Sequence, residues 1–424
     1  MQFQNTLRFA KQLDQQDPLK SFRDRFIIPA GDGKQQVYFL GNSLGLQPKS
    51  AKEAIQQVLQ QWADFGVEGF FKGDEPWLQY HDSLTGPLSE IVGALPNEVV
   101  VMNQLSVNLH LMMVSFYKPS GKRIKILCEE KAFPSDQYMF ETYIKHMGLN
   151  PGEVLIEISP RAGEYTIRTE DILSAIENHK EEIALIFFGG LNYYTGQAFD
   201  MQTITTAAHT IGAHAGFDLA HAVGNISLHL HNWNVDFACW CSYKYLNSGP
   251  GAVGGVFIHE RFHSDTSIHR YAGWWGYKKE TRFLMEKGFV PIPSAEGWQL
   301  STPSMILYAC HKAALDIFSE AGLDRLHAKR LLLNNYLWFF LDEINGKMDK
   351  TYFQIITPNE QIARGCQVSM LMHEQGKAIY DGLIQEGMIV DWREPNVIRL
   401  APVPLYNTFE EVWRFCTLFE KLLE

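Results

Sequence analysis

Seven short apolar runs between about residues 97 and 260 constrain the fold of this chain more than any other feature. They are mostly apolar on both faces, which is typical of strands that are covered on both sides. Segments with helical spacing, such as PSDQYMFETYIKHMG and TEDILSAIENHK, separate several of them. The runs are EVVVMN, RIKILCE, EVLIEIS, IALIFFGG, AHAGFDL, DFACWCS and GGVFIHE. They predict an α/β fold with a mostly parallel, seven-stranded sheet between two layers of helices.

The pattern changes after about residue 303. Five apolar residues at helical spacing predict a long amphipathic helix: Leu333, Leu337, Phe340, Leu341 and Ile344. The strand-like runs TYFQIIT, GCQVSMLMH, MIVDW and NVIRLAP follow, with helices over about 376–386 and from about Thr408. We therefore expect a large domain over residues 61–302 and a small α+β domain over residues 303–424. Residues 1–60 are expected to form an N-terminal segment that packs on the small domain.

Composition excludes several classes of partner. The 424 residues carry 48 acidic and 37 basic side chains, a formal net charge of -11, and no basic stripe that would bind nucleic acid. The N-terminus is polar, and no run of 18 apolar residues predicts a membrane span. We expect a cytoplasmic protein without a membrane partner. The six cysteines lack metal-ligand spacing and are interpreted as buried free thiols, so we expect no metal site.

Two turns that follow predicted strands carry groups suited to binding. A strand becomes a helix at Gln104, Leu105 and Ser106, which forms either an anion site or a plain serine N-cap. Another strand ends on Asp218, with His221 three residues later. A buried carboxylate requires a partner, which is either a cation on a ligand or a buried salt bridge.

Lys244 ends a third apolar run, in SYKYLNSGPG. A lysine desolvated in a cleft loses its proton readily and can form a Schiff base with an aldehyde. A surface lysine is the alternative, but it leaves Trp240, Cys241 and the flanking tyrosines unexplained. The phosphate cradle, the strand-end aspartate and the lysine together match the needs of pyridoxal 5'-phosphate.

The chain also resembles the kynureninases, pyridoxal phosphate enzymes of the aminotransferase class V, type I fold. The motifs that carry the resemblance are YFLGNSLGLQP, FPSD, GFDLAHAVGN, DFACWCSYKYLNSGPG, GWWG and NVIRLAPVPLYN. The resemblance runs from about residue 37 to the C-terminus. It implies hydrolytic cleavage of L-kynurenine or 3-hydroxy-L-kynurenine between Cβ and Cγ to L-alanine and an anthranilate, in tryptophan degradation or NAD biosynthesis.

The resemblance also implies a role for each site residue. Lys244 would bind the cofactor aldehyde and move protons, Tyr243 would donate a proton, and Asp218 would pair with the pyridine nitrogen. The other implied cofactor contacts are Leu105, Ser106, Phe133, Asp136, His221, Tyr243, Trp274 and Thr302. The implied substrate contacts are Asn42, Ser43, Phe70, Ser301 and Arg399, where Arg399 would bind the α-carboxylate or, by strand alternation alone, face solvent.

A homodimer with shared active sites is expected, because enzymes of this fold complete the site from a neighbouring chain. Trp274 and Thr302 are the predicted donors, and a local turn and a helix N-cap are the alternatives for them. Two positions depart from the family pattern: several members carry histidine in place of Phe70 and serine in place of Gly189. These departures leave recognition of the substrate ring and one cofactor contact open.

Two other functions remain compatible with the sequence. A cysteine desulfurase or selenocysteine lyase would need a reactive thiol, for which Cys366 is the candidate by position, although its apolar run predicts burial. A non-catalytic protein that binds the same cofactor is the second alternative.

Overall fold

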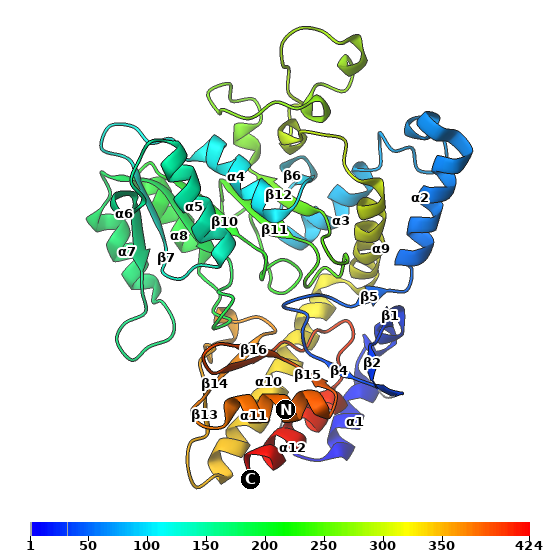
Figure 1. The fold of residues 1–424 in the computed structure, drawn as a ribbon, viewed down its shortest axis with the longest axis vertical. Helices are drawn as coiled ribbons and strands as arrows, with labels where there is room; N and C mark the ends of the chain where they lie inside the picture. Colours follow the sequence, from blue (N-terminus) through cyan, green and yellow to red (C-terminus); the bar gives the residue numbers. More distant parts are fainter. Residues whose placement is uncertain (1, 32) are drawn as a thin grey trace.

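The structure is a computed structural model that describes residues 2–31 and 33–424 (Figure 1). These residues form a seven-stranded sheet in the order β6-β12-β11-β10-β9-β7-β8. Its strands are β6 Val99–Val101, β7 Lys125–Glu129, β8 Leu155–Ile158, β9 Ile183–Gly189, β10 His214–Asp218, β11 Phe237–Cys241 and β12 Gly254–Ile258. β12 is antiparallel to β11 and β6, and the other neighbours pair in parallel. Each predicted run forms one of these strands, and the predicted fold class is confirmed.

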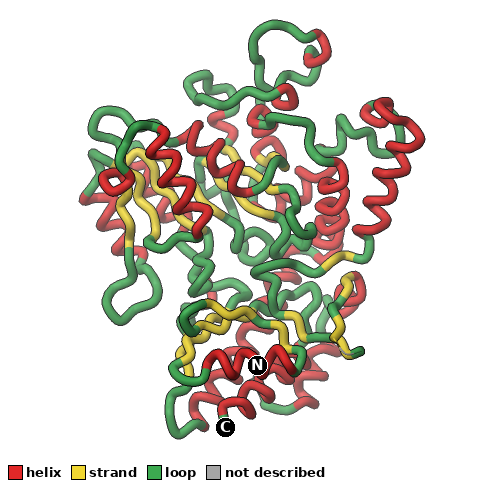
Figure 2. Tube along the Cα trace, viewed as in Figure 1, coloured by secondary structure: helices red, strands yellow, loops and turns green. Residues whose placement is uncertain are grey.

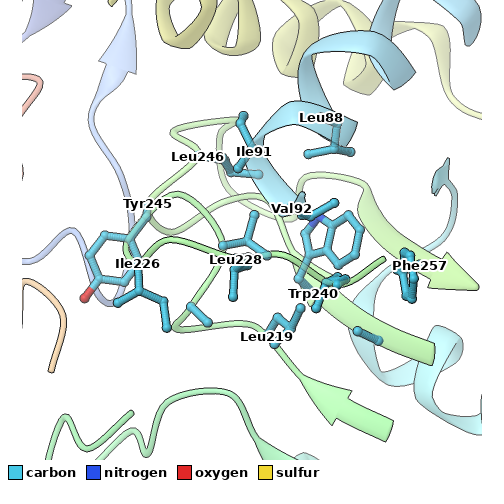
Figure 3. Packing of buried hydrophobic residues seen from close by; sticks show 14 of the residues in the cluster. Leu88, Ile91, Val92, Leu219, Ile226, Leu228, Trp240, Tyr245, Leu246 and Phe257 are labelled. Atoms are coloured by element: carbon cyan, nitrogen blue, oxygen red, sulfur yellow. The ribbon is translucent and has the colours of Figure 1, made fainter. Parts of the chain in front are cut away.

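Alternate side chains of this sheet enter two separate apolar cores. Leu127 and Phe188 pack on one side, while their neighbours Ile126 and Phe187 pack on the other. Helices cover both faces: α3 Asp82–Val92, α7 Thr169–Asn178 and α8 Met201–Thr210 on one, α4 Leu105–Phe116 and α5 Pro134–His146 on the other. Figure 3 shows Trp240 of β11 beside Val92 of α3. Burial on both faces explains why a strand such as β11, which is buried at every position, is apolar throughout.

A third core forms around a four-stranded sheet in the order β13-β14-β17-β16. Figure 1 places this small unit below the large sheet, together with both ends of the chain. Leu333, Leu337 and Ile344 of the predicted long helix are buried in it. Its elements are α10 Leu323–Lys347, β13 Phe353–Ile355, β14 Val368–Met372, α11 Gly376–Gln385, β16 Asp391–Arg393, β17 Val397–Leu400 and α12 Phe409–Leu423.

The N-terminal segment and α9 (Met305–Ala321) connect the two units. Ala10 of α1 is buried in the core of the small unit, whereas Phe22 is buried in the core of the large unit. Tyr308 and Phe318 of α9 also belong to the large core. The domain boundaries stay a prediction. The other elements are α1 Leu7–Gln16, α2 Ala51–Phe65, α6 Pro151–Val154, β1 Phe26–Ile27, β2 Ala30–Gly31, β3 Lys34–Gln35, β4 Val37–Tyr38, β5 Gln47–Pro48 and β15 Met388–Ile389 (Figure 2).

The predicted run MIVDW is divided between two pairings. Met388 and Ile389 pair in parallel with β4, whereas Asp391 and Trp392 pair with β17. One short run therefore ties the N-terminal segment to the small sheet. Within the part of the chain that the structure describes, no helix combines the length and apolarity needed to cross a membrane.

Candidate active site

The carboxyl ends of the parallel strands border a cavity of about 220 Å³. Asp218, at the end of β10, lies in register with Gly189 at the end of β9, and Glu129 ends β7. Open α/β sheets bind ligands at this edge. The lining residues are Gln104, Leu105, Ser106, Glu129, Phe133, Ser135, Asp136, Gly189, Leu191, Tyr193, Asp218, Ala220, His221, Tyr243 and Lys244. They include eight of the residues predicted to bind the cofactor.

Lys244 is positioned by the turn that follows β11 and by the N-terminal segment. The Gly45 N–H donates to the Tyr243 carbonyl at 2.8 Å. A Cβ at residue 45 would lie 2.3 Å from the Lys244 carbonyl oxygen, so only glycine permits this close approach. The GNSLGLQP and SYKYLN motifs are thus adjacent parts of one structure.

The Lys244 amine lies beside aromatic groups and a histidine. Its Nζ is 2.9 Å from His221 Nε2 and 5.6 Å from the Phe133 ring centroid. Burial, followed by the charge of Lys244, holds the pKa of His221 well below its usual range. The imidazole is therefore neutral, and its Nε2 can accept a hydrogen bond from the amine.

Three buried carboxyl groups face the same cavity. Burial is the largest cause that raises the pKa of each, and it brings Glu129 to about 7. The pKa of Asp136 lies well above its usual range because of burial and the nearby Asp218. Asp218 itself accepts the Ala220 N–H at 2.7 Å. Such a cluster favours a cationic ligand group at Asp218.

The start of α4, which also lines the cavity, suits an anion. α4 begins at Leu105, and none of the described side chains caps its first turn. The N–H groups of an uncapped first turn bind phosphate well. The alternative of a plain serine N-cap is wrong for Ser106, since it lies inside the helix and Gln104 holds the N-cap position.

Tyr243 also lines the cavity. Burial, followed by the Cys241 thiol, raises the pKa of Tyr243, so its hydroxyl keeps its proton at neutral pH. The cavity therefore offers a free lysine amine, an anion site, a strand-end carboxylate and a phenol donor. These groups fit pyridoxal phosphate. His221 Nδ1 is buried and has no hydrogen-bond partner among the described residues, so it is available to a ligand.

The predicted substrate residues of the N-terminal segment and of the small unit lie outside the cavity lining. Asn42 is buried and donates to Gln367 Oε1 at 3.0 Å, and Ser43 closes a turn on the Leu40 carbonyl. Arg399 is 1% exposed, so the solvent-facing alternative is wrong. Its Nε donates to Asp391 Oδ2 at 2.6 Å, and its Nη1 donates to the carbonyl of the cavity residue Tyr193.

The predicted ring and dimer residues also lie outside this cavity. Phe70 stacks edge-on against Trp77, with ring centroids 5.2 Å apart. Trp274 is 45% exposed, and Ser301 and Thr302 are exposed as well. The N-cap alternative for Thr302 is wrong, because Ser304 caps α9 by accepting the Leu307 N–H.

Sequence reasoning missed five lining residues: Glu129, Ser135, Leu191, Tyr193 and Ala220. Glu129 closes an apolar strand with a carboxylate, which is the signal that identified Asp218, so it could have been found. Tyr193 lies in a loop, and its hydrogen bonds to Gln367 and Arg399 are made by its backbone carbonyl, which the sequence does not distinguish.

None of the cysteines lines the cavity, and His221 is the one histidine among its lining residues. Of the six thiols, all in the described residues, five are buried and Cys310 is partly exposed. Outside the cavity, Glu98, His231 and His259 lie close enough to hold a metal ion. Hydrogen bonds account for this cluster: His231 Nδ1 lies 3.0 Å from Glu98 Oε1, which also accepts the Glu260 N–H.

Comparison with known proteins decides the family. Residues 326–419 match the kynureninase C-terminal domain. A kynureninase of Flavobacterium psychrophilum is 54% identical over 421 residues, which cover 99% of both chains. The chain belongs to the kynureninase family. A kynureninase of Nematostella vectensis is 46% identical over 97% of this chain and 92% of its own.

Solved structures with low identity share the family's fold. C-DES with glycine covalently linked to its pyridoxal phosphate cofactor gives a TM-score of 0.75 at 17% identity, over 91% of this chain and 96% of that one. A cysteine desulfurase from Thermococcus onnurineus gives 0.74 at 18% identity, over 91% and 94%. At this identity they speak for the fold alone, so the choice of substrate depends on the kynureninase relatives.

Proposed function

We propose that the protein is a pyridoxal phosphate-dependent hydrolase that cleaves L-kynurenine and 3-hydroxy-L-kynurenine between Cβ and Cγ. The products are L-alanine and anthranilate or 3-hydroxyanthranilate. Two observations support the proposal. The chain is 54% identical to a kynureninase over nearly its full length, and its cavity carries groups that fit the cofactor. In the cell this reaction serves tryptophan degradation or NAD biosynthesis, in the cytoplasm.

The proposal gives separate tasks to the main cavity residues. Bound pyridoxal phosphate supplies a ring that withdraws electrons from the α-carbon of the substrate. Lys244 would hold the cofactor through Nζ and would then move protons at the substrate. Asp218 accepts the pyridine N–H, and the neighbouring Asp136 keeps its proton, so the site does not hold two adjacent bare carboxylates.

The remaining tasks are to hold the cofactor, to donate a proton and to bind the α-carboxylate of the substrate. Leu105 and Ser106 would hold the phosphate through backbone N–H groups, and Phe133 would lie against the cofactor ring. Tyr243 donates a proton to the leaving carbanion, consistent with its raised pKa. Arg399 binds the α-carboxylate. Three of its five N–H groups contact Asp391 and Tyr193, so two remain for a ligand.

We also propose a homodimer with shared sites. Trp274 and Thr302, predicted to complete the cofactor pocket, lie outside the cavity of their own chain. Large apolar side chains are exposed over residues 62–71, at and just after the end of α2, and over residues 271–290, including Trp62 (64%), Val67 (73%), Phe71 (53%) and Met285 (70%). Exposed apolar surface of this extent indicates an interface. A second copy that covers it would bring Trp274 to a neighbouring cavity.

The cysteine desulfurase alternative lacks its reactive thiol. Cys366 is 1% exposed, and burial raises the pKa of its thiol to about 12. A thiol in this state is neither accessible nor ionised at neutral pH.

Product analysis tests the proposed activity. Purified protein with pyridoxal phosphate is incubated with each kynurenine and, in parallel, with L-cysteine. The proposal predicts fluorescent anthranilate and one equivalent of alanine from kynurenine, and no sulfide from cysteine. Cofactor binding without any product would instead favour the non-catalytic alternative, and sulfide release would favour the desulfurase.

A further inference from the structure

The turn formed by residues 192–195 joins the cofactor cavity to the small unit. Three successive carbonyls of this turn accept side-chain donors from the small unit: Tyr193 from Gln367 (2.9 Å) and Arg399, Tyr194 from Ser369 (2.6 Å), and Thr195 from Thr357 (2.6 Å). The guanidinium of Arg399 is therefore fixed on one side by this turn and on the other by Asp391.

Glu129 holds the same turn from the cavity side. Its Oε2 accepts from Asn192 Nδ2 at 2.7 Å, and its Oε1 accepts the Gly189 N–H at 3.2 Å. The other end of the Asn192 amide closes the turn, because Oδ1 accepts the N–H groups of Tyr194 (3.0 Å) and Thr195 (2.9 Å). A continuous set of hydrogen bonds thus runs from Glu129 through Asn192 and the turn to Arg399.

We propose that Glu129 is a positioning residue for Arg399. It orients Asn192, Asn192 sets the direction of the Tyr193 carbonyl, and that carbonyl fixes the guanidinium where a substrate carboxylate can reach it. This inference depends on the proposed function, in which Arg399 binds the α-carboxylate. Its consequence is specific: loss of Glu129 weakens binding of ligands that carry the carboxylate and spares ligands that lack it.

Three substitutions separate this role from a general structural one. Glu129→Gln keeps the shape of the side chain but leaves it only one acceptor oxygen. Either the Gly189 N–H or Asn192 Nδ2 then faces an NH₂ group instead of an acceptor. Asn192→Ala removes the next link. Glu157→Gln is the matched control: it is the same change on the neighbouring strand β8, at an exposed residue paired in register with Cys128.

Position 189 offers an independent way to displace the carboxylate. A Cβ at Gly189 would lie 2.9 Å from Glu129 Oε1, which is closer than real contacts allow. Gly189→Ala should therefore change the same binding properties in the same direction as Glu129→Gln, without changing the charge of the cavity.

The experiment compares the holoenzymes of the parent and of these variants. We measure kcat and KM for L-kynurenine, and the affinities for L-alanine and for the amine analogue of kynurenine without the α-carboxylate, both followed by cofactor absorbance. For Glu129→Gln and Asn192→Ala we expect KM and the alanine dissociation constant to rise about tenfold, with kcat within about threefold. The affinity for the amine should be unchanged, and Glu157→Gln should match the parent.

An equal loss of affinity for the amine, or unchanged affinity for alanine, would overturn the positioning role. If Glu129→Gln does not fold, Asn192→Ala carries the same prediction. The double variant should bind alanine no more weakly than Asn192→Ala alone, since the two residues act in series. If the parent protein binds alanine but releases no anthranilate, the proposed function is contradicted. The affinities of the variants for alanine and for the amine still test the positioning role in that case.

Discussion

The cofactor cavity and the region around Trp274 differ in how much of a site one chain supplies. In the cavity, eight predicted residues from separate segments meet because parallel strands end at the same edge of the sheet. Around Trp274, the predicted residues are exposed or pack away from the cavity. The difference teaches that a fold fixes the part of a site built on strand ends, whereas the exposed segments of the same chain do not join that cavity.

The largest effect is expected from Lys244→Ala. Loss of the amine should lower kcat/KM for kynurenine by several orders of magnitude, at least about a thousandfold, since no other group in the cavity can attack the aldehyde. Turnover is measured by anthranilate fluorescence, and cofactor content by absorbance after dialysis. Cofactor should stay bound through the phosphate and Asp218. Retained turnover would show that the cavity does not depend on Lys244.

A smaller loss is expected from Asp218→Asn. A charged hydrogen bond contributes roughly 1.5 to 3 kcal/mol, so we expect a loss in kcat/KM of about ten- to a hundredfold. The matched control is Asp236→Asn: Asp236 lies near the start of the adjacent strand β11 and contacts His209 and Arg261 rather than the cavity. If Asp218→Asn and Asp236→Asn lower kcat/KM equally, Asp218 contributes to the stability of the fold rather than to the cofactor.

Mixing two inactive chains tests the region around Trp274. Lys244→Ala removes the lysine of a chain's own cavity, and Trp274→Ala should remove a contact to the neighbour's cavity. If the sites are shared, random exchange gives half heterodimers with one intact site each, so about a quarter of the parent activity should return. No recovery despite exchange, or full activity of a sedimenting monomer, would place Trp274 in the site of its own chain or in none.

The smallest expected effect concerns the substrate ring. Phe70 offers stacking but no hydrogen bond to a 3-hydroxyl, whereas Ser301 and Thr302 can supply one. We expect both kynurenines to react, with a preference below about a hundredfold, or roughly 2.7 kcal/mol. The kcat/KM ratio for the two substrates is compared in the parent and in Phe70→His. A thousandfold preference in the parent, or a ratio that Phe70→His leaves unchanged, would remove Phe70 from ring recognition.

The sheet was predictable because its strands leave a signal along the chain. Apolar runs such as IALIFFGG predict buried strands. Asp218 and Lys244, which lie at the ends of two other such runs, are charged residues in apolar surroundings and therefore indicate a functional site. Asp136 and Phe133 came from family resemblance instead, since a turn before a helix looks the same with or without a ligand.

Long-range contacts were not predictable in the same way. Alternation left Arg399 free to face solvent, and only the partners Asp391 and Tyr193, the latter 206 residues away, show how its charge is buried. MIVDW looked like one strand because the sequence does not reveal that its two halves pair with different segments.

Covalent labelling tests the central claim, that the strand ends of a single chain carry the cofactor lysine. The protein is loaded with pyridoxal phosphate, reduced with borohydride, digested, and the peptides are mapped by mass spectrometry. The account predicts one pyridoxyl group per chain, on Lys244 in the peptide that contains SYKYLN. A label on another lysine, or no label at full cofactor occupancy, would contradict it.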